Sequence, residues 1–149
     1  MSLVARALHL GWRFTRPLTG GARGMVLEGG RVLLVRHTYV SGWHLPGGGV
    51  EAGETFEEAL GRELDEEAAV TLAERPQLFG LYHNVTGATR RDHVALYVVR
   101  AFTRRPFEPT REIAEVALYP VGDLPDGTTD AVRARVREVV EGLPPAPRW

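Results

Sequence analysis

The chain is 149 residues long, which is enough for one domain with a hydrophobic core and too short for two of ordinary size. Hydrophobic residues make up 44% of it and its formal net charge at pH 7 is −1, so the composition favours neither nucleic acid nor a membrane as the main partner. Cysteine is absent, which excludes disulfides, thiolate chemistry and Cys-based zinc sites. Without a long apolar run or a secretory signal pattern, residues 1–149 are expected to form a single cytoplasmic domain.

Residues 1–18 are predicted to form a short amphipathic helix. Leu3, Ala7, Leu10 and Phe14 recur at helical spacing among arginines, and Pro17 closes the segment. Packing on its own domain, or on a second copy in a homodimer, accounts for this pattern better than binding to a membrane surface.

Residues 22–37 predict a β-hairpin. Its two β-rich halves, 22–28 and 32–37, are joined by the two-residue turn Gly29-Gly30. Residues 43–45 can form at most a short strand, because glycine and proline surround them. Three further strands are expected at residues 77–84, 93–102 and 116–119.

A closing helix is predicted over residues 129–141. Its valines fall on one side, so the charged residues Arg133, Arg135, Arg137 and Glu138 are expected to lie largely outside. The prolines that follow predict an extended or frayed tail over residues 143–149.

The segment from Gly47 to Val70 carries the strongest functional signal. It reads GGGVEAGETFEEALGRELDEEAAV, a glycine-rich loop followed by an acidic helix. Thr55 and Glu58 have the spacing of a capping box, so the helix is expected to begin just after Glu54 and to run to about Ala69.

Three carboxylates share one side of this helix. Glu63, Glu66 and Glu67 stand three and four residues apart, on the side that also carries Ala59 and Leu60. Carboxylates crowded beside a core repel one another and resist desolvation unless a cation compensates them. This pattern indicates a divalent metal, and ligands that are all oxygen favour Mg²⁺ or Mn²⁺ over Zn²⁺.

The same segment resembles the signature of the Nudix hydrolases. That signature is a glycine, five residues, a glutamate, seven residues, and then Arg-Glu-apolar-any-Glu-Glu-any-Gly-apolar. The matching positions here are Gly48, Glu54, Arg62, Glu63, Leu64, Glu66, Glu67 and Val70. Ala69 stands where the family has its last glycine, a change to a residue that is nearly as small. The fold expected from this resemblance and from the element order is α/β, a Nudix-like α/β/α sandwich in which a mixed sheet lies between the two helices.

The resemblance implies metal-dependent hydrolysis of a pyrophosphate bond in a nucleoside diphosphate linked to another group. It implies that Glu63, Glu66 and Glu67 bind the metal together with the backbone carbonyl of Gly47. Arg62 would orient these acids through charge-assisted hydrogen bonds and so assist catalysis.

Gly48 and Glu54 would have structural roles in the loop. The resemblance also implies that the general base is either Glu63 or a glutamate of a later loop, where Glu112 and Glu115 are the candidates and Glu115 is slightly favoured.

The substrate is expected to be a small nucleotide-type molecule, either a nucleoside triphosphate or a nucleotide sugar. Aromatic stacking and arginine contacts to phosphate would suit such a molecule. The candidates for these contacts are Arg36, Trp43, Tyr82, Arg90 and Arg91. The alternative function is a catalytically silent nucleotide-sensing module on the same fold, which would have no need for all three helix acids.

Overall fold

The protein is described by a computed structural model that covers residues 18–85 and 90–149. In chain order the elements are β1 (Thr19–Glu28), β2 (Arg31–His37), β3 (Trp43–His44), β4 (Gly47–Gly49), α2 (Phe56–Ala68), β5 (Val70–Leu72), β6 (Gln77–Asn84), β7 (Asp92–Val99), β8 (Phe102–Arg104), β9 (Ile113–Pro120) and α3 (Asp130–Glu141). The helix expected at residues 1–18 lies almost wholly outside the described residues, so its packing stays a prediction. Neither α2 nor α3 is long and apolar enough to cross a membrane.

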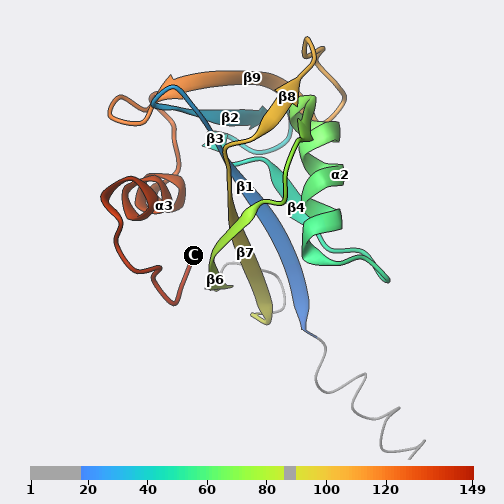
Figure 1. The fold of residues 1–149 in the computed structure, drawn as a ribbon, viewed down its shortest axis with the longest axis vertical. Helices are drawn as coiled ribbons and strands as arrows, with labels where there is room; N and C mark the ends of the chain where they lie inside the picture. The colour runs from blue at the N-terminus through green and yellow to red at the C-terminus, as the bar shows by residue number, and fades with distance from the viewer. Residues whose placement is uncertain (1–17, 86–89) are drawn as a thin grey trace, which may run out of the picture.

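The strands form a mixed sheet between the two helices. β3, β2, β1, β7 and β6 lie side by side in that order, with β4 added alongside β1 and β9 alongside β2. β1 runs parallel to β7 and antiparallel to β2 and β4. Figure 1 shows α2 on one side of this sheet and α3 on the other. The expected α/β/α sandwich is therefore confirmed.

The predicted hairpin is present as β1 and β2. Leu27 pairs with Val32, and the turn residues Gly29 and Gly30 have φ of 56° and 74°. Two consecutive positive φ values are what a tight two-residue hairpin turn requires, and glycine adopts them at little cost. The first strand begins further upstream than expected, at Thr19, and its upstream part pairs with β4 and β7 instead of β2.

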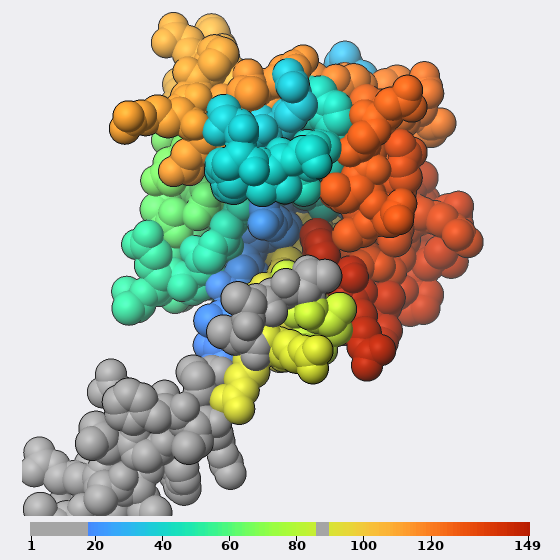
Figure 2. All heavy atoms as spheres, turned by 180° about the vertical axis from the view of Figure 1, so that it is seen from behind, coloured from blue at the N-terminus to red at the C-terminus, as the bar shows by residue number. Residues whose placement is uncertain are grey.

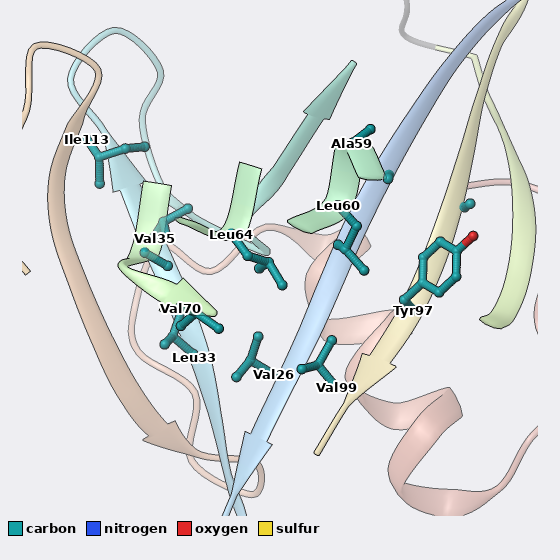
Figure 3. Packing of buried hydrophobic residues seen from close by; sticks show 13 residues of the cluster. Val26, Leu33, Val35, Ala59, Leu60, Leu64, Val70, Tyr97, Val99 and Ile113 are labelled. Atoms are coloured by element: carbon teal, nitrogen blue, oxygen red, sulfur yellow. The ribbon is translucent and has the colours of Figure 1, made fainter. Parts of the chain in front are cut away.

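Each face of the sheet packs against one helix. On the α2 face, Leu60 and Leu64 point toward Val26 and Val35 of the strands, as Figure 3 shows. Neighbouring strand residues point the opposite way, so Leu34 belongs to the second cluster, which α3 covers. Side chains placed on β2 therefore face α2 or α3 according to their position in this alternation.

The start of α2 confirms the predicted capping box. The Thr55 hydroxyl accepts a hydrogen bond from Glu58 N at 3.2 Å, and Glu58 Oε2 accepts one from Thr55 N at 2.8 Å. At the other end, Ala69 takes the left-handed conformation, with φ of 54°. A residue with a Cβ pays about 1 kcal/mol for this conformation, so the substitution for glycine is tolerated with a small loss of stability.

Some strand predictions were wrong in detail. The strand expected at residues 93–102 ends at Val99, and residues from Phe102 onward form β8, which pairs with β5. The strand expected at 116–119 is longer and begins at Ile113. The short strands β4 and β5 were not predicted, because their pairing partners lie far away in the sequence.

Two charged residues of α3 are buried rather than outside. Arg135 is 3% exposed and Glu138 is 8% exposed. Two hydrogen bonds of 2.7 and 2.8 Å join the Arg135 guanidinium to the Glu138 carboxylate, and the hydroxyl of Tyr82 donates a third bond to Glu138 at 2.9 Å. Opposite charges that satisfy each other in this way can be buried, which helical periodicity alone does not reveal.

The tail after α3 is extended, as predicted, but it is fastened to the domain. Trp149 N donates to His83 O at 3.1 Å and His83 N donates to Pro147 O at 2.9 Å, so the tail runs alongside β6. Ala146 N also donates to Glu138 Oε1 at 3.1 Å. Through these bonds the tail carries the ring of Trp149 to within 5.4 Å of the ring of Tyr82.

Candidate active site

The glycine-rich segment brings backbone close to two neighbouring elements. β4 pairs with β1, with Gly47 opposite Arg23 and Gly48 opposite Ala22. At Gly47, where φ is 140°, an added Cβ would collide with the carbonyl oxygen of Ala22. At Gly48 an added Cβ would collide with the carboxylate of Glu63. The absence of side chains here lets the acids of α2 lie directly against the loop.

A cavity of about 370 Å³ lies between this loop, the end of β2 and α2. It is lined by Arg23, His37, Tyr39, Val40, His44, Gly47, Gly48, Glu63, Glu67 and Glu112. We call it the acid cavity, since three carboxylates meet in it. Glu66, the third acid of the predicted metal set, is not among the lining residues; 60% of its side chain is exposed, and its carboxylate lies 3.6 Å from Arg62 Nη1.

Arg62 joins the glycine-rich loop to the acids of α2. Its Nε and Nη2 donate to the Glu54 carboxylate at 2.8 and 3.0 Å, and its Nη1 donates to Glu63 Oε1 at 2.8 Å. The bonds from Arg62 lower the pKa of Glu54 to about 2, while the two acids raise the pKa of Arg62. This is the arrangement expected for Arg62 and Glu54, in which a bidentate pair fixes one acid and orients the next.

Glu67 is the most deeply placed of the helix acids. It is 7% exposed, and its Oε2 accepts a hydrogen bond from Gly47 N at 2.9 Å. Burial raises the pKa of Glu67 to about 7, against the opposing effects of Gly47 N and Arg23, and the charges of Glu63 and Glu112 add to the rise. A cation in the cavity would favour the ionised carboxylate.

The site residues fit a divalent cation, although they do not already surround one. Within the described ranges, no group of three or more His, Asp or Glu side chains converges as ready-made metal ligands. Glu63 is instead held by Arg62, and the carbonyl oxygen of Gly47 accepts a bond from Arg23 Nη1 at 2.5 Å. Hard oxygen donors around one cavity are nevertheless what Mg²⁺ and Mn²⁺ prefer.

His37 provides a second sign that something is to be bound here. Its Nδ1 is buried and, in the described part of the chain, has no hydrogen-bond partner. Buried polar atoms are rarely left in this state. Burial lowers the pKa of His37, and the nearby His44 and Arg23 lower it further, so the imidazole is neutral near pH 7.

The two late-loop glutamates lie on different faces of the sheet. Glu112 lines the acid cavity, where the bond from Thr38 N to its carbonyl at 2.8 Å fastens its loop to the end of β2. Glu115 pairs with Arg36, whose Nη2 donates to Glu115 Oε2 at 2.7 Å, and Arg36 lies over the ring of Trp43 on the α3 face. The structure therefore brings Glu112, but not the slightly favoured Glu115, to the helix acids.

Several predicted substrate contacts lie away from the acid cavity. Tyr82 is fully buried, with its hydroxyl bonded to Glu138, so the prediction that it contacts substrate is wrong. Trp43 is 8% exposed and packs edge-on against Tyr119 at 5.1 Å, in the core beneath α3. Arg36 is partly exposed but faces away, together with Glu115. Tyr82 and Trp43 belong to the hydrophobic cluster beneath α3. A sequence pattern cannot distinguish aromatic residues that pack in a core from aromatic residues that stack on a substrate.

Arg90 and Arg91 are exposed beside a second cavity. Arg90 has φ of 54° and its carbonyl accepts a bond from His83 Nε2 at 2.9 Å, while the carbonyl of Arg91 accepts one from Thr19 N at 3.2 Å. These bonds place both arginines where β7 begins next to β1.

The second cavity, also of about 370 Å³, adjoins the acid cavity. It is lined by Leu18, Thr19, Gly20, Gly21, Arg23, Gly48, Gly49, Val50, Asn84, Asp92, Val94 and Trp149. Arg23 and Gly48 line both cavities. Figure 2 shows the molecule hollowed below the cyan segment, with the blue of β1 in the hollow. We call the second cavity the nucleoside-sized cavity.

Arg23, His37 and Trp149 are among the lining residues that were missed from the sequence. Arg23 and His37 belong to the predicted hairpin, and nothing in their spacing shows that β4 and α2 will cover them. Trp149 reaches its cavity only through the bonds between the tail and β6.

Known proteins share this arrangement. A model of the NUDIX domain matches residues 18–141. A MutT-like protein from Streptomyces ambofaciens is 32% identical over 123 residues, which is 74% of this chain and 78% of that protein. A curated relative from Mycobacterium tuberculosis is 31% identical over 103 residues, and the chain spans only 42% of its length. The crystal structure of a MutT NUDIX hydrolase from Burkholderia pseudomallei matches with a TM-score of 0.73 and 28% identity, over 83% of this chain and 99% of that one.

The family model covers most of the chain, and the Streptomyces relative matches along nearly three quarters of it. Of the signature residues, Gly48, Glu63 and Glu67 line one cavity, and Arg62 donates a hydrogen bond to Glu63. The chain therefore belongs to the Nudix hydrolase family and is a pyrophosphohydrolase of the Nudix type.

Proposed function

We propose that this chain hydrolyses a pyrophosphate bond in a nucleoside diphosphate linked to another group, with Mg²⁺ or Mn²⁺ held by Glu63, Glu66, Glu67 and the carbonyl of Gly47. The proposal rests on one observation: Glu63, Glu67 and Glu112 line the same cavity, and the buried carboxylate of Glu67 would be stabilised in its ionised form by a cation there. When bound, the ion neutralises charge on the phosphate oxygens and acidifies a water molecule.

The chain's own residues then have distinct tasks. Arg62 holds Glu63 against the loop, so that the carboxylate does not have to be ordered when substrate arrives. Glu112 accepts the proton of the attacking water, because it lies in the acid cavity and Glu115 does not. Arg23 lines both cavities and donates to the Gly47 carbonyl, so its guanidinium is placed where it would bind a phosphate oxygen of the substrate.

The nucleoside-sized cavity would receive the nucleoside. Gly48, which also lines the acid cavity, and Trp149 are among its lining residues. Asn84 and Asp92 line it as well, and Asn84 Nδ2 donates to Asp92 Oδ2 at 3.0 Å. An aromatic surface beside a few fixed polar groups suits a base and a sugar. Both nucleoside triphosphates and nucleotide sugars place a pyrophosphate next to such a nucleoside.

A substrate screen tests the proposal. Purified protein should be incubated with nucleoside triphosphates and nucleotide sugars, in Mg²⁺, in Mn²⁺ and in excess chelator, and the nucleotide products should be separated by chromatography. We expect cleavage of at least one class, at the pyrophosphate and only with a divalent ion. Tight nucleotide binding without turnover across both classes would instead identify a silent sensing module.

A further inference from the structure

We propose that His37, together with Glu67, would supply a ligand to the cation in the acid cavity, and that the site consequently prefers Mn²⁺ to Mg²⁺. This inference rests on the proposed function, which places a divalent cation beside Glu67. It differs from the sequence-based expectation that all ligands are oxygen atoms.

The two side chains face each other without touching. His37 Nδ1 lies 4.0 Å from Glu67 Oε1, and the two side chains are 8% and 10% exposed. The other oxygen of the carboxylate, Oε2, is already held by Gly47 N at 2.9 Å. Glu67 therefore directs Oε1 toward a buried imidazole nitrogen that has no hydrogen-bond partner among the described residues.

The separation is wrong for a hydrogen bond and suitable for a shared cation. A nitrogen and an oxygen 4.0 Å apart are beyond hydrogen-bond range. Two ligand atoms that each lie about 2.0–2.2 Å from one ion stand roughly 3–4 Å apart, depending on the angle at the ion. A cation can thus bind both atoms with small side-chain movements.

The imidazole is held in place by its neighbours. Its ring centre lies 5.2 Å from that of Tyr39 and 5.4 Å from that of His44. His37 also sits where the pairing of β2 with β9 is irregular, since Arg36 pairs with Glu115 but His37 pairs with Ile113. This irregularity fixes the end of β2 over the acid cavity, so the ring does not have to be ordered by the metal.

A nitrogen ligand changes which ion the cavity prefers. Mg²⁺ takes oxygen ligands almost exclusively, whereas imidazole nitrogen suits first-row transition ions. Among the described residues that line the cavity, three carboxylates outnumber the guanidinium of Arg23, and even with Arg62 bonded to Glu63 the acids are in excess, so the cavity attracts a divalent cation. Mn²⁺ accepts both kinds of ligand and is paramagnetic, which makes it the probe for this proposal.

The experiment is pulsed electron paramagnetic resonance on Mn²⁺ bound to the full chain, prepared once with natural histidine and once with ¹⁵N-histidine. We expect nuclear modulation from a directly bound nitrogen that changes from the ¹⁴N to the ¹⁵N pattern on labelling. The modulation should vanish in His37→Gln and persist in His44→Gln, whose ring lies against that of His37. A titration should show that His37→Gln weakens Mn²⁺ binding about tenfold relative to Mg²⁺.

Three results would overturn the inference. Bound Mn²⁺ without histidine modulation would show that His37 is at most a neighbour of Glu67, and it would leave the proposed hydrolysis intact. A wild-type chain that binds no divalent ion would overturn this inference and the proposed function together. If the signal persisted in His37→Gln and were lost in His44→Gln, the bound nitrogen would belong to His44 and not to His37.

Discussion

The backbone N–H of Gly47 donates a hydrogen bond to Oε2 of Glu67 at 2.9 Å, and this bond ties β4 to the last turn of α2. It explains why the glycine-rich loop and the acidic helix work as one unit. The loop supplies a donor that keeps a buried carboxylate in place, and the helix supplies the carboxylates that face the cavity. Changes that separate the two should therefore affect metal binding before they affect the fold.

Gly48→Ala should weaken Mn²⁺ binding and slow turnover, each by about tenfold or more. The added Cβ would collide with the carboxylate of Glu63, which would have to move away from Arg62. Gly49→Ala is the matched control, since a Cβ there meets nothing within 4 Å. Equal Mn²⁺ affinities in the two variants, measured by calorimetric titration, would contradict the role given to Gly48.

Glu112→Gln should lower kcat about 10²–10⁴-fold, as expected for the loss of a general base. Glu115→Gln should leave kcat nearly unchanged, because Glu115 is bonded to Arg36 on the α3 face. Steady-state kinetics on the best substrate from the screen, at saturating Mg²⁺, compares the two. A larger loss of kcat in Glu115→Gln than in Glu112→Gln would favour Glu115 as the general base, as the sequence suggested, and would contradict the assignment of Glu112.

Arg135→Ala should lower the free energy of unfolding by about 3–5 kcal/mol, because it leaves the Glu138 carboxylate buried without its partner. Arg137→Ala, two residues away, removes an exposed pair with Glu141 and should cost about 0.5 kcal/mol or less. Urea unfolding followed by tryptophan fluorescence measures both. Similar losses in the two variants would show that the buried network does not stabilise the fold as inferred.

The same network predicts a pH dependence. Burial raises the pKa of Glu138, but the bonds from Arg135, Tyr82 and Ala146 N outweigh it and bring the pKa below the ordinary value of 4.5. A carboxyl whose pKa is lower in the folded state stabilises the fold above its unfolded pKa, and this contribution is lost as the pH falls through the folded value. The difference in Tm between wild type and Glu138→Gln should hence be constant above pH 5 and shrink as the pH falls below about 4.5. A Tm difference that grows as the pH falls would contradict the inference that the folded state lowers the pKa of Glu138.

Local chemistry made much of the fold predictable. The capping box at Thr55 and the turn at Gly29-Gly30 depend on residues a few positions apart, so their patterns are visible in the sequence. Of the three acids of the predicted metal set, Glu63 and Glu67 line one cavity as their spacing suggests, whereas Glu66 is exposed and does not line it. Burial of Arg135 with Glu138 was not predictable, because it depends on Tyr82 and on the tail, which come from distant parts of the chain.

The choice between Glu112 and Glu115 shows the limit for the site. Glu112 directly precedes β9 and Glu115 lies near its start. Only the pairing of β9 with β2 decides on which face of the sheet each glutamate lies. Long-range register of this kind leaves no mark on the local sequence. The same holds for His37 and Arg23, which enter the acid cavity through the strands that flank them.

The most direct test of the central claim is the metal-dependent turnover of Glu67→Gln, with Glu74→Gln as an exposed control. The account predicts that Glu67→Gln keeps the circular dichroism spectrum of the wild type, binds Mn²⁺ more weakly and loses most of its turnover, while Glu74→Gln matches the wild type in all three. Wild-type turnover in Glu67→Gln would contradict the assignment of the acid cavity as the active site.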